Sequence, residues 1–206
     1  MSAAGATVPI PAEPPELEAR VVKVGSYLLA AATAFFFVAF LFAFLYLRAL
    51  NSNGLWAGGK PGHHVHPSLG AGIAVLVCVL VSVGLVRLAL MEVRTRARSI
   101  WRLAGGAALL LGLAAVGVQC WQYTHLGFGP GDGGYASVYL GWTGFFTIFT
   151  FAAMLWLETL LVSTRRTAIA VVPAPQLESG VAALSLCWTM LGFVEIAAFV
   201  LLFGVK

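Results

Sequence analysis

The sequence predicts an all-α integral membrane protein, a bundle of five transmembrane helices. Of its 206 residues, 60% are hydrophobic and 10% are charged, whereas about a quarter of the residues in a soluble domain are charged. A helix that crosses a bilayer needs about 20 apolar residues, and the chain contains five such runs. The composition excludes a soluble globular domain, a disordered chain and a nucleic-acid binder, which needs clustered Lys and Arg.

The first two spans are expected at 25–47 and 69–90. The first has no charged residue and is dense in phenylalanine. The second extends past Arg87, because a long cationic side chain can reach the headgroups while its stem stays in apolar surroundings. Residues 1–24 contain four prolines and three glutamates, and they are expected to form an extended polar tail.

The remaining spans are expected at 103–125, 135–162 and 180–205, which completes a membrane domain over 25–206. The third and fourth are separated by 127–134, where glycine and proline residues predict a tight, non-helical turn. The fourth and fifth are separated by an expected linker around Pro173 and Pro175.

The distribution of basic residues predicts the orientation in the membrane. Lys and Arg in short loops are retained on the cytoplasmic side, and nine of the twelve in this chain fall on one side of the expected spans. The N-terminus is therefore expected inside and the C-terminus outside. The nine residues are Arg20, Lys23, Arg87, Arg94, Arg96, Arg98, Arg102, Arg165 and Arg166.

The cysteine and histidine residues do not predict a redox centre in this chain. Each of the three cysteines lies on a different span with no C-x-x-C spacing, which is typical of small buried apolar residues. Haem ligation within a membrane needs imidazoles inside the spans, and all four histidines lie in expected loops or at the end of a span. His63, His64 and His66 are candidate ligands for a divalent metal, and a solvated polar loop is the alternative.

Glu195 is the one carboxylate deep within a span, in the outer half of the bilayer. A lone carboxylate there is expected to be protonated or hydrogen-bonded to another helix, because ionisable groups in hydrocarbon are costly. Two interpretations stay open. Glu195 is either a proton-relay group or a structural contact between helices.

Other polar residues mark helix contacts. Gln119 and Gln122 are three residues apart, hence on one helix face, where glutamine side chains can tie helices together. Thr143 lies on a polar face of the fourth span, which ends near Glu158. Glu158 is expected at the inner boundary, within reach of Arg165 or Arg166, as an interfacial anchor.

Three segments, in this order, resemble subunit III of haem-copper terminal oxidases of the cytochrome c oxidase type. The first is 111–123 with its glutamines and tyrosine, followed by Gly-Tyr-Ala-Ser at 134–137. The second is Thr143, Gly144 and Phe145, similar to the family's Thr-Gly-Phe-His signature. The third is Phe-Val-Glu-Ile at 193–196, similar to the family's Phe-Val-Asp.

The chain also departs from the family's pattern. Thr33 stands where the family has a glutamate in the first of these helices. Phe146 and Phe149 stand at the two positions of the family's His-x-x-His. Gln122 replaces a glutamate, whereas Glu195 keeps an acid where the family has aspartate.

The resemblance implies a non-redox subunit of an aerobic terminal oxidase in the bacterial cytoplasmic membrane. Such a subunit stabilises the catalytic subunit and its proton uptake and binds phospholipid. Its partners would be the catalytic subunit I and subunit II, and haem and copper would lie in those chains. Three alternatives are an accessory subunit of a nitric oxide reductase, a small stand-alone proton channel or transporter that uses Glu195, and a metal-handling protein that uses the loop histidines.

Overall fold

The computed structural model describes residues 14–51, 56, 67–95, 98–166 and 174–205, and the secondary structure in these ranges is entirely helical. All five long helices are sufficiently long and apolar to cross a membrane, which confirms the expected all-α fold with five potential membrane-spanning helices. The helices are α1 (Pro15–Ala49), α2 (Leu69–Arg94), α3 (Arg98–Thr124), α4 (Gly134–Arg166) and α5 (Ala174–Phe199), and α5 continues into the π-helical turn η1 (Val200–Gly204).

The helices begin and end outside the expected spans. α1 begins at Pro15, so the second part of the expected tail is helical. Proline is favoured in the first turn of a helix, and Glu16 and Glu18 follow it there, where acidic groups interact favourably with the helix dipole. α5 begins at Ala174, so Pro175 also lies in a first helical turn and not in a linker.

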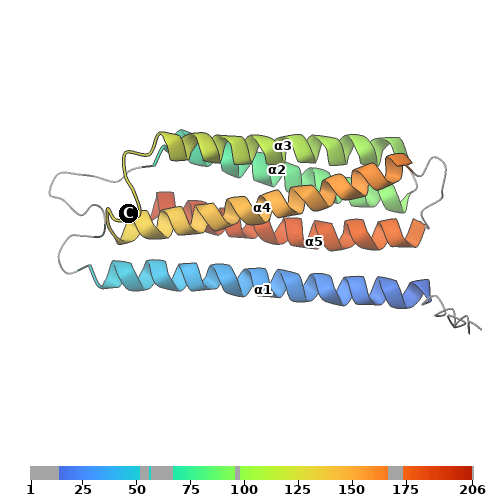
Figure 1. Ribbon diagram of the computed structural model, residues 1–206, viewed down its shortest axis with the longest axis horizontal. Coiled ribbons are helices and arrows are strands. Elements are labelled where there is room, and N and C mark those ends of the chain that lie inside the picture. Colours follow the sequence, from blue (N-terminus) through green and yellow to red (C-terminus); the bar gives the residue numbers. More distant parts are fainter. Residues whose placement is uncertain (1–13, 52–55, 57–66, 96–97, 167–173, 206) are drawn as a thin grey trace, which may run out of the picture.

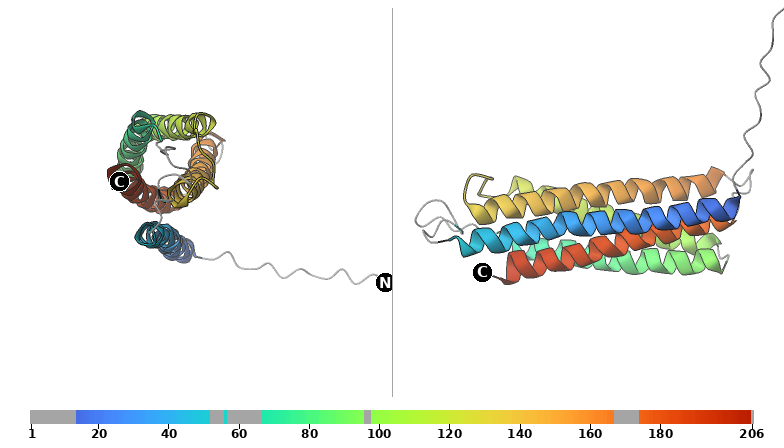
Figure 2. Two further views of the ribbon diagram at one scale, coloured as in Figure 1. Left: turned by 90° about the vertical axis from the view of Figure 1, so that its left-hand side faces the viewer. Right: turned by 90° about the horizontal axis from the view of Figure 1, so that it is seen from below.

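Four of the helices form a ring, and the fifth lies outside it. α2 contacts α3, α3 contacts α4, α4 contacts α5, and α5 contacts α2, so that α2 and α4 occupy opposite corners of the ring (Figure 2). α1 packs against α5 and α4 on the outside, parallel to the long axis of the bundle (Figure 1). The interior of the ring is therefore the place where the helices can bury polar groups.

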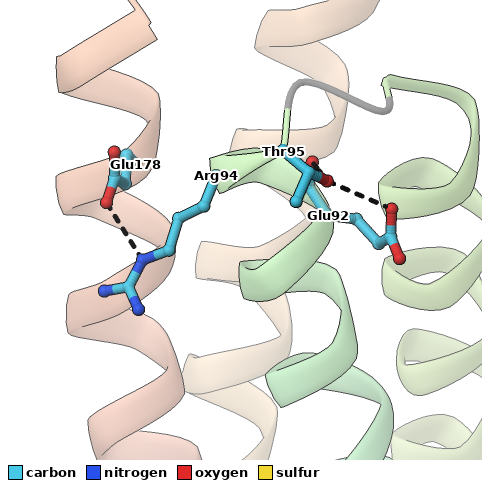
Figure 3. Close-up of polar contacts among 4 residues, drawn as sticks. All are labelled: Glu92, Arg94, Thr95 and Glu178. Carbon is cyan, nitrogen blue, oxygen red and sulfur yellow. Dashed lines mark hydrogen bonds and ion pairs between the residues drawn. The ribbon is translucent and has the colours of Figure 1, made fainter.

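One end of the bundle, here called the basic end, holds the first residues of α1, α3 and α5 and the last residues of α2 and α4 (Figure 1). Arg94 Nε of α2 lies 3.0 Å from Glu178 Oε1 of α5 (Figure 3). Gln176 Nε2 of α5 donates a 2.8 Å hydrogen bond to Glu18 Oε2 of α1. Polar contacts between side chains thus join α2, α5 and α1 at this end.

α1 is attached to α4 by aromatic rings. Phe36 lies 5.0 Å from Phe145 and 5.5 Å from Phe149, measured between ring centroids, and Phe37 lies 6.0 Å from Trp142. The opposite face of α1 is exposed, as at Phe35 and Phe42. The phenylalanines of the first span therefore divide between helix packing and a surface available to lipid.

Trp56 connects α1 to α4 at the end of the bundle opposite the basic end. Its ring lies 5.1 Å from Phe44 of α1 and 5.8 Å from Tyr135 of α4. Its carbonyl accepts a 3.1 Å hydrogen bond from the backbone nitrogen of Tyr135. Its own nitrogen donates a 3.0 Å bond to Asn51 Oδ1. One buried side chain in a connecting segment thus fixes the separation of two helices.

The segment between α3 and α4 is the expected tight turn. The Asp132 carboxylate accepts a 2.6 Å hydrogen bond from the backbone nitrogen of Gly129, and the Asp132 nitrogen donates a 3.1 Å bond to the Gly129 carbonyl. Gly133 follows with φ 123°, a conformation that residues with a Cβ rarely adopt. This turn returns the chain directly into α4.

Candidate functional site

A set of polar side chains is buried among the helices, mainly in the half of the ring away from the basic end. Each member is exposed by less than a tenth of its surface. Such groups need hydrogen bonds to offset the cost of leaving water. The set comprises Ser82 of α2, Gln119 and Gln122 of α3, Thr143 and Thr150 of α4, and Glu195 of α5.

Glu195 is buried among the helices. Only 7% of its surface is exposed, and its neighbours Val194 and Ala198 on α5 are buried with it. Tyr139 of α4 lies close enough to interact electrostatically with the Glu195 carboxyl group. The carboxyl group therefore lies in the helix bundle and near a phenol group.

Tyr123 joins α3 to α4 through hydroxyl groups. Its Oη donates a 2.8 Å hydrogen bond to Thr143 Oγ1, and that hydroxyl donates a 2.7 Å bond to the Tyr139 carbonyl. One turn further along α4, Thr147 Oγ1 donates a 2.8 Å bond to the Thr143 carbonyl. The first two bonds thus connect the end of α3 to α4 through the Thr143 hydroxyl.

Gln119 and Gln122 are both buried, as their spacing on one face predicts, but they have different neighbours. Gln122 Nε2 donates a 3.2 Å hydrogen bond to the Ser68 carbonyl at the start of α2, which ties α3 to α2. Gln119 lies beside the phenol groups of Tyr123 and Tyr139. Its buried amide nitrogen nevertheless has no hydrogen-bond partner.

A narrow crevice, too tight to hold a water molecule, lies between α2, α3 and α4. Gln119 and Thr150 line it together with apolar side chains such as Val75 and Phe146. The buried Gln119 Nε2 and Thr150 Oγ1 atoms both lack hydrogen-bond partners. An unmade buried hydrogen bond costs about 1–3 kcal/mol, so stability alone does not explain why these two polar side chains occupy this crevice.

The other predicted residues lie elsewhere. Gly144 lies next to the site, where an added Cβ would be 4.0 Å from the Tyr123 hydroxyl. Glu158 is exposed on α4, and the side chains of its expected partners Arg165 and Arg166 lie outside the described residues. His63, His64 and His66 also lie outside them. Within the described ranges, no three His, Cys, Asp or Glu side chains are close enough together to hold a metal ion.

Sequence reasoning missed Tyr123 and Tyr139 as members of the site. Tyr123 follows Gln119 by four residues and therefore shares its helix face, which is a signal that the sequence contains. Tyr139 precedes Thr143 by the same spacing on α4. A tyrosine near the end of a span is also typical of a residue that anchors a helix at the membrane surface. The sequence alone does not distinguish such an anchor from a member of the buried site.

Two of the three segments that carry the family resemblance are joined by the hydrogen bond between Tyr123 and Thr143, and the third contains the buried Glu195 on the neighbouring helix α5. Tyr123 comes from 111–123, Thr143 from the Thr-Gly-Phe segment, and Glu195 from 193–196. The site offers hydroxyl groups, a carboxamide and a carboxyl group in an apolar surrounding, which is suited to hydrogen bonding between helices or to holding a proton. No model of a known protein family matches the chain, and no curated protein matches it.

Proposed function

We propose that the chain is a non-redox subunit, similar to subunit III, of an aerobic haem-copper terminal oxidase. It would lie in the bacterial cytoplasmic membrane with its basic end toward the cytoplasm, because Lys and Arg in short loops are retained there. Its role would be to stabilise the catalytic subunit and that subunit's proton uptake. Haem and copper would lie in the catalytic subunit I and in subunit II.

The observation that carries the proposal is the hydrogen bond between Tyr123 and Thr143, which joins two of the three resembling segments, together with the burial of Glu195, from the third segment, on the neighbouring helix α5. Residues that are far apart in the sequence and match the family in order, such as Tyr123, Thr143 and Glu195, come from three helices of one ring. The exposed apolar surface of α1, with Phe35 and Phe42, supports binding of phospholipid chains.

The proposal is tested by purifying the tagged chain from its native membrane in mild detergent. We expect haem-containing partner chains to co-purify, with the absorption band of an a-type haem. A nitric oxide reductase partner would be recognised by its different haem type and its different catalytic chain. A colourless preparation without a large membrane partner would contradict both assignments.

A second candidate function, a small proton channel or transporter, is favoured by the burial of Glu195 beside Tyr139. Its test is proton flux into liposomes that contain only this chain. Flux that disappears with Glu195→Gln and persists with Glu178→Gln would establish the channel. Glu178 is a matched control because it is a carboxylate of the same helix that lies exposed at the basic end. If the chain is an oxidase subunit, we expect no proton flux with the unmodified chain, with Glu195→Gln or with Glu178→Gln.

A further inference from the structure

The turn η1 (Val200–Gly204) connects opposite corners of the ring at the end of the bundle away from the basic end. On one side, Tyr135 Oη of α4 donates a 2.7 Å hydrogen bond to the Leu202 carbonyl. On the other side, the Phe203 ring lies against α2, where a Cβ added to Gly72 would be only 2.6 Å from it. Because α2 and α4 occupy opposite corners (Figure 2), η1 extends across this end of the ring.

Phe203 lies directly on the backbone of α2. Gly72 is in the first turn of that helix and is buried, and a residue with a Cβ at this position would collide with the aromatic ring. Phe199, at the end of α5, stacks on the same ring at 5.3 Å between centroids. The ring is carried by a π-helical turn, a rare geometry that occurs frequently at functional sites.

Glu195 lies behind this ring, toward the basic end. It precedes Phe203 by eight residues, which at 1.5 Å per residue is a distance of about 12 Å along the helix. Tyr139 of α4 connects the two levels. Its ring is 6.3 Å from the Phe203 ring, edge to face, and its phenol group is close enough to the Glu195 carboxyl group to interact electrostatically. Aromatic rings therefore stand between the buried carboxyl group and this end of the bundle.

Other aromatic side chains extend this layer of rings. Phe128, which follows α3, lies 5.8 Å from Tyr139 between ring centroids. Trp56 lies 5.8 Å from Tyr135 on the side toward α1. A layer of apolar groups excludes water from the space behind it, as hydrophobic constrictions do in channels. Phe203 completes this layer toward α2.

We propose that Phe203 is a lid that closes this end of the ring over Glu195 and separates the carboxyl group from the water beyond it. The lid needs two features, an aromatic ring at Phe203 and the bare backbone of Gly72 on which that ring lies. Loss of either feature is expected to open the same path to Glu195. The inference concerns contacts within this chain and goes beyond the proposed function, on which it does not rest.

The proposal is tested by the rate at which a charged thiol reagent modifies Glu195→Cys. The measurement uses the full chain with its three native cysteines replaced by alanine. A methanethiosulfonate that carries a sulfonate group is added to native membranes, opened so that the reagent reaches both faces, and the modified fraction is measured by mass spectrometry. We expect slow modification when Phe203 is present. With Phe203→Ala we expect a rate at least about tenfold higher, because the thiol then reacts without prior local opening.

A matched control removes a ring of the same size from the outside of the bundle. Phe193 lies two residues from Glu195 on α5 and is 63% exposed, so Phe193→Ala is expected to leave the rate of modification unchanged. Equal acceleration by Phe193→Ala and Phe203→Ala would show a general loosening of α5 and would overturn the proposal.

Gly72→Ala tests the same contact from α2 without removing the ring. Its Cβ is expected to displace Phe203 and to raise the rate. Gly70→Ala is the control, since the nearest atom to an added Cβ there is Ser68 Oγ at 3.9 Å, and it is expected to have no effect. Adding Gly72→Ala to Phe203→Ala is expected to give no further increase, because both changes act on one contact.

Three results would overturn the proposal. The first is that Glu195→Cys reacts as fast with Phe203 present as with Phe203→Ala. The second is that Gly72→Ala fails to raise the rate. The third is that Phe203→Ala and Gly72→Ala both react at the rate of the chain unfolded in dodecyl sulfate, which would show loss of the fold and not an open lid.

Discussion

The indole nitrogen of Trp188 donates a 2.8 Å hydrogen bond to the hydroxyl of Ser82, and both side chains are buried at the middle of the ring. Ser82 in turn donates a 2.7 Å bond to the Val79 carbonyl, which orients its oxygen to accept from the indole. Gly112 and Met154 pack at the same level. One tryptophan of α5 thus bonds to α2 and packs beside Gly112 of α3.

Trp188→Phe is expected to destabilise the protein by about 1–3 kcal/mol, because it removes the hydrogen bond and leaves part of the indole volume unfilled. The measurement is thermal unfolding in detergent micelles. Trp121→Phe is the matched control, since Trp121 is 54% exposed, and it is expected to leave the unfolding temperature unchanged. Equal effects of the two substitutions would show that Trp188 does not pack as described.

Gly192→Ala is expected to destabilise the contact between α5 and α2 by about 1–3 kcal/mol, as overpacking of a close helix contact does. An added Cβ would lie 2.9 Å from Val83 Cγ2, whereas one on Gly117 of α3 would meet nothing within 4 Å. Gly117→Ala is therefore the control, and it is expected to stabilise its helix by up to about 1 kcal/mol. A lower unfolding temperature for Gly192→Ala and a higher one for Gly117→Ala would support the close packing of α5 against α2. A neutral Gly192→Ala would contradict it.

Trp56→Ala is expected to cost about 3–5 kcal/mol, the usual cost of truncating a large buried aromatic residue. It removes the ring contacts with Phe44 and Tyr135 and so loosens α1 from α4. The effect is measured as a fall in unfolding temperature and as faster hydrogen exchange at the start of α4. Trp121→Ala serves as the exposed control. An unaltered exchange rate at Tyr135 in the Trp56 variant would refute the anchoring role.

Gln119→Leu is expected to leave the stability unchanged or to raise it, whereas Tyr123→Phe is expected to lower it. Gln119 Nε2 has no partner, so its replacement by an apolar side chain of similar size removes an unsatisfied group and is expected to be neutral or stabilising. Tyr123→Phe removes the bond to Thr143 and is expected to cost about 0.6–1.7 kcal/mol. The two are compared by thermal unfolding. Loss of stability in Gln119→Leu would mean that its amide is satisfied in the membrane.

The number of helices and their order along the chain can be predicted from the sequence. Uninterrupted apolar runs predict the spans, but α1 begins at Pro15 and not at 25, because a helix continues where polar residues are solvated at the membrane surface. Gly133 and Asp132 likewise behave as their residue types predict, in a tight turn.

The helix faces were harder to predict from the sequence. A helix that is apolar on every side gives no periodic signal for its buried face. Depth within the span set Glu195 apart from Glu158, but no pattern showed which helix face carries either residue; Glu195 is buried and Glu158 is exposed. The contact between Tyr123 and Thr143 depends on the register of α3 against α4, which the turn between them sets. Trp56 was also unexpected, because a residue in a polar connecting segment has no pattern that predicts burial.

The most direct measurement of the proposed function is the haem content of the complex that co-purifies with the tagged chain. An oxidase subunit predicts haem that elutes with the chain in a fixed ratio through successive columns, together with copper and a larger membrane subunit. The ratio is expected to persist in Gly117→Ala, which leaves the packing intact. A homogeneous, folded preparation of the chain with neither haem nor a larger membrane subunit would contradict the assignment.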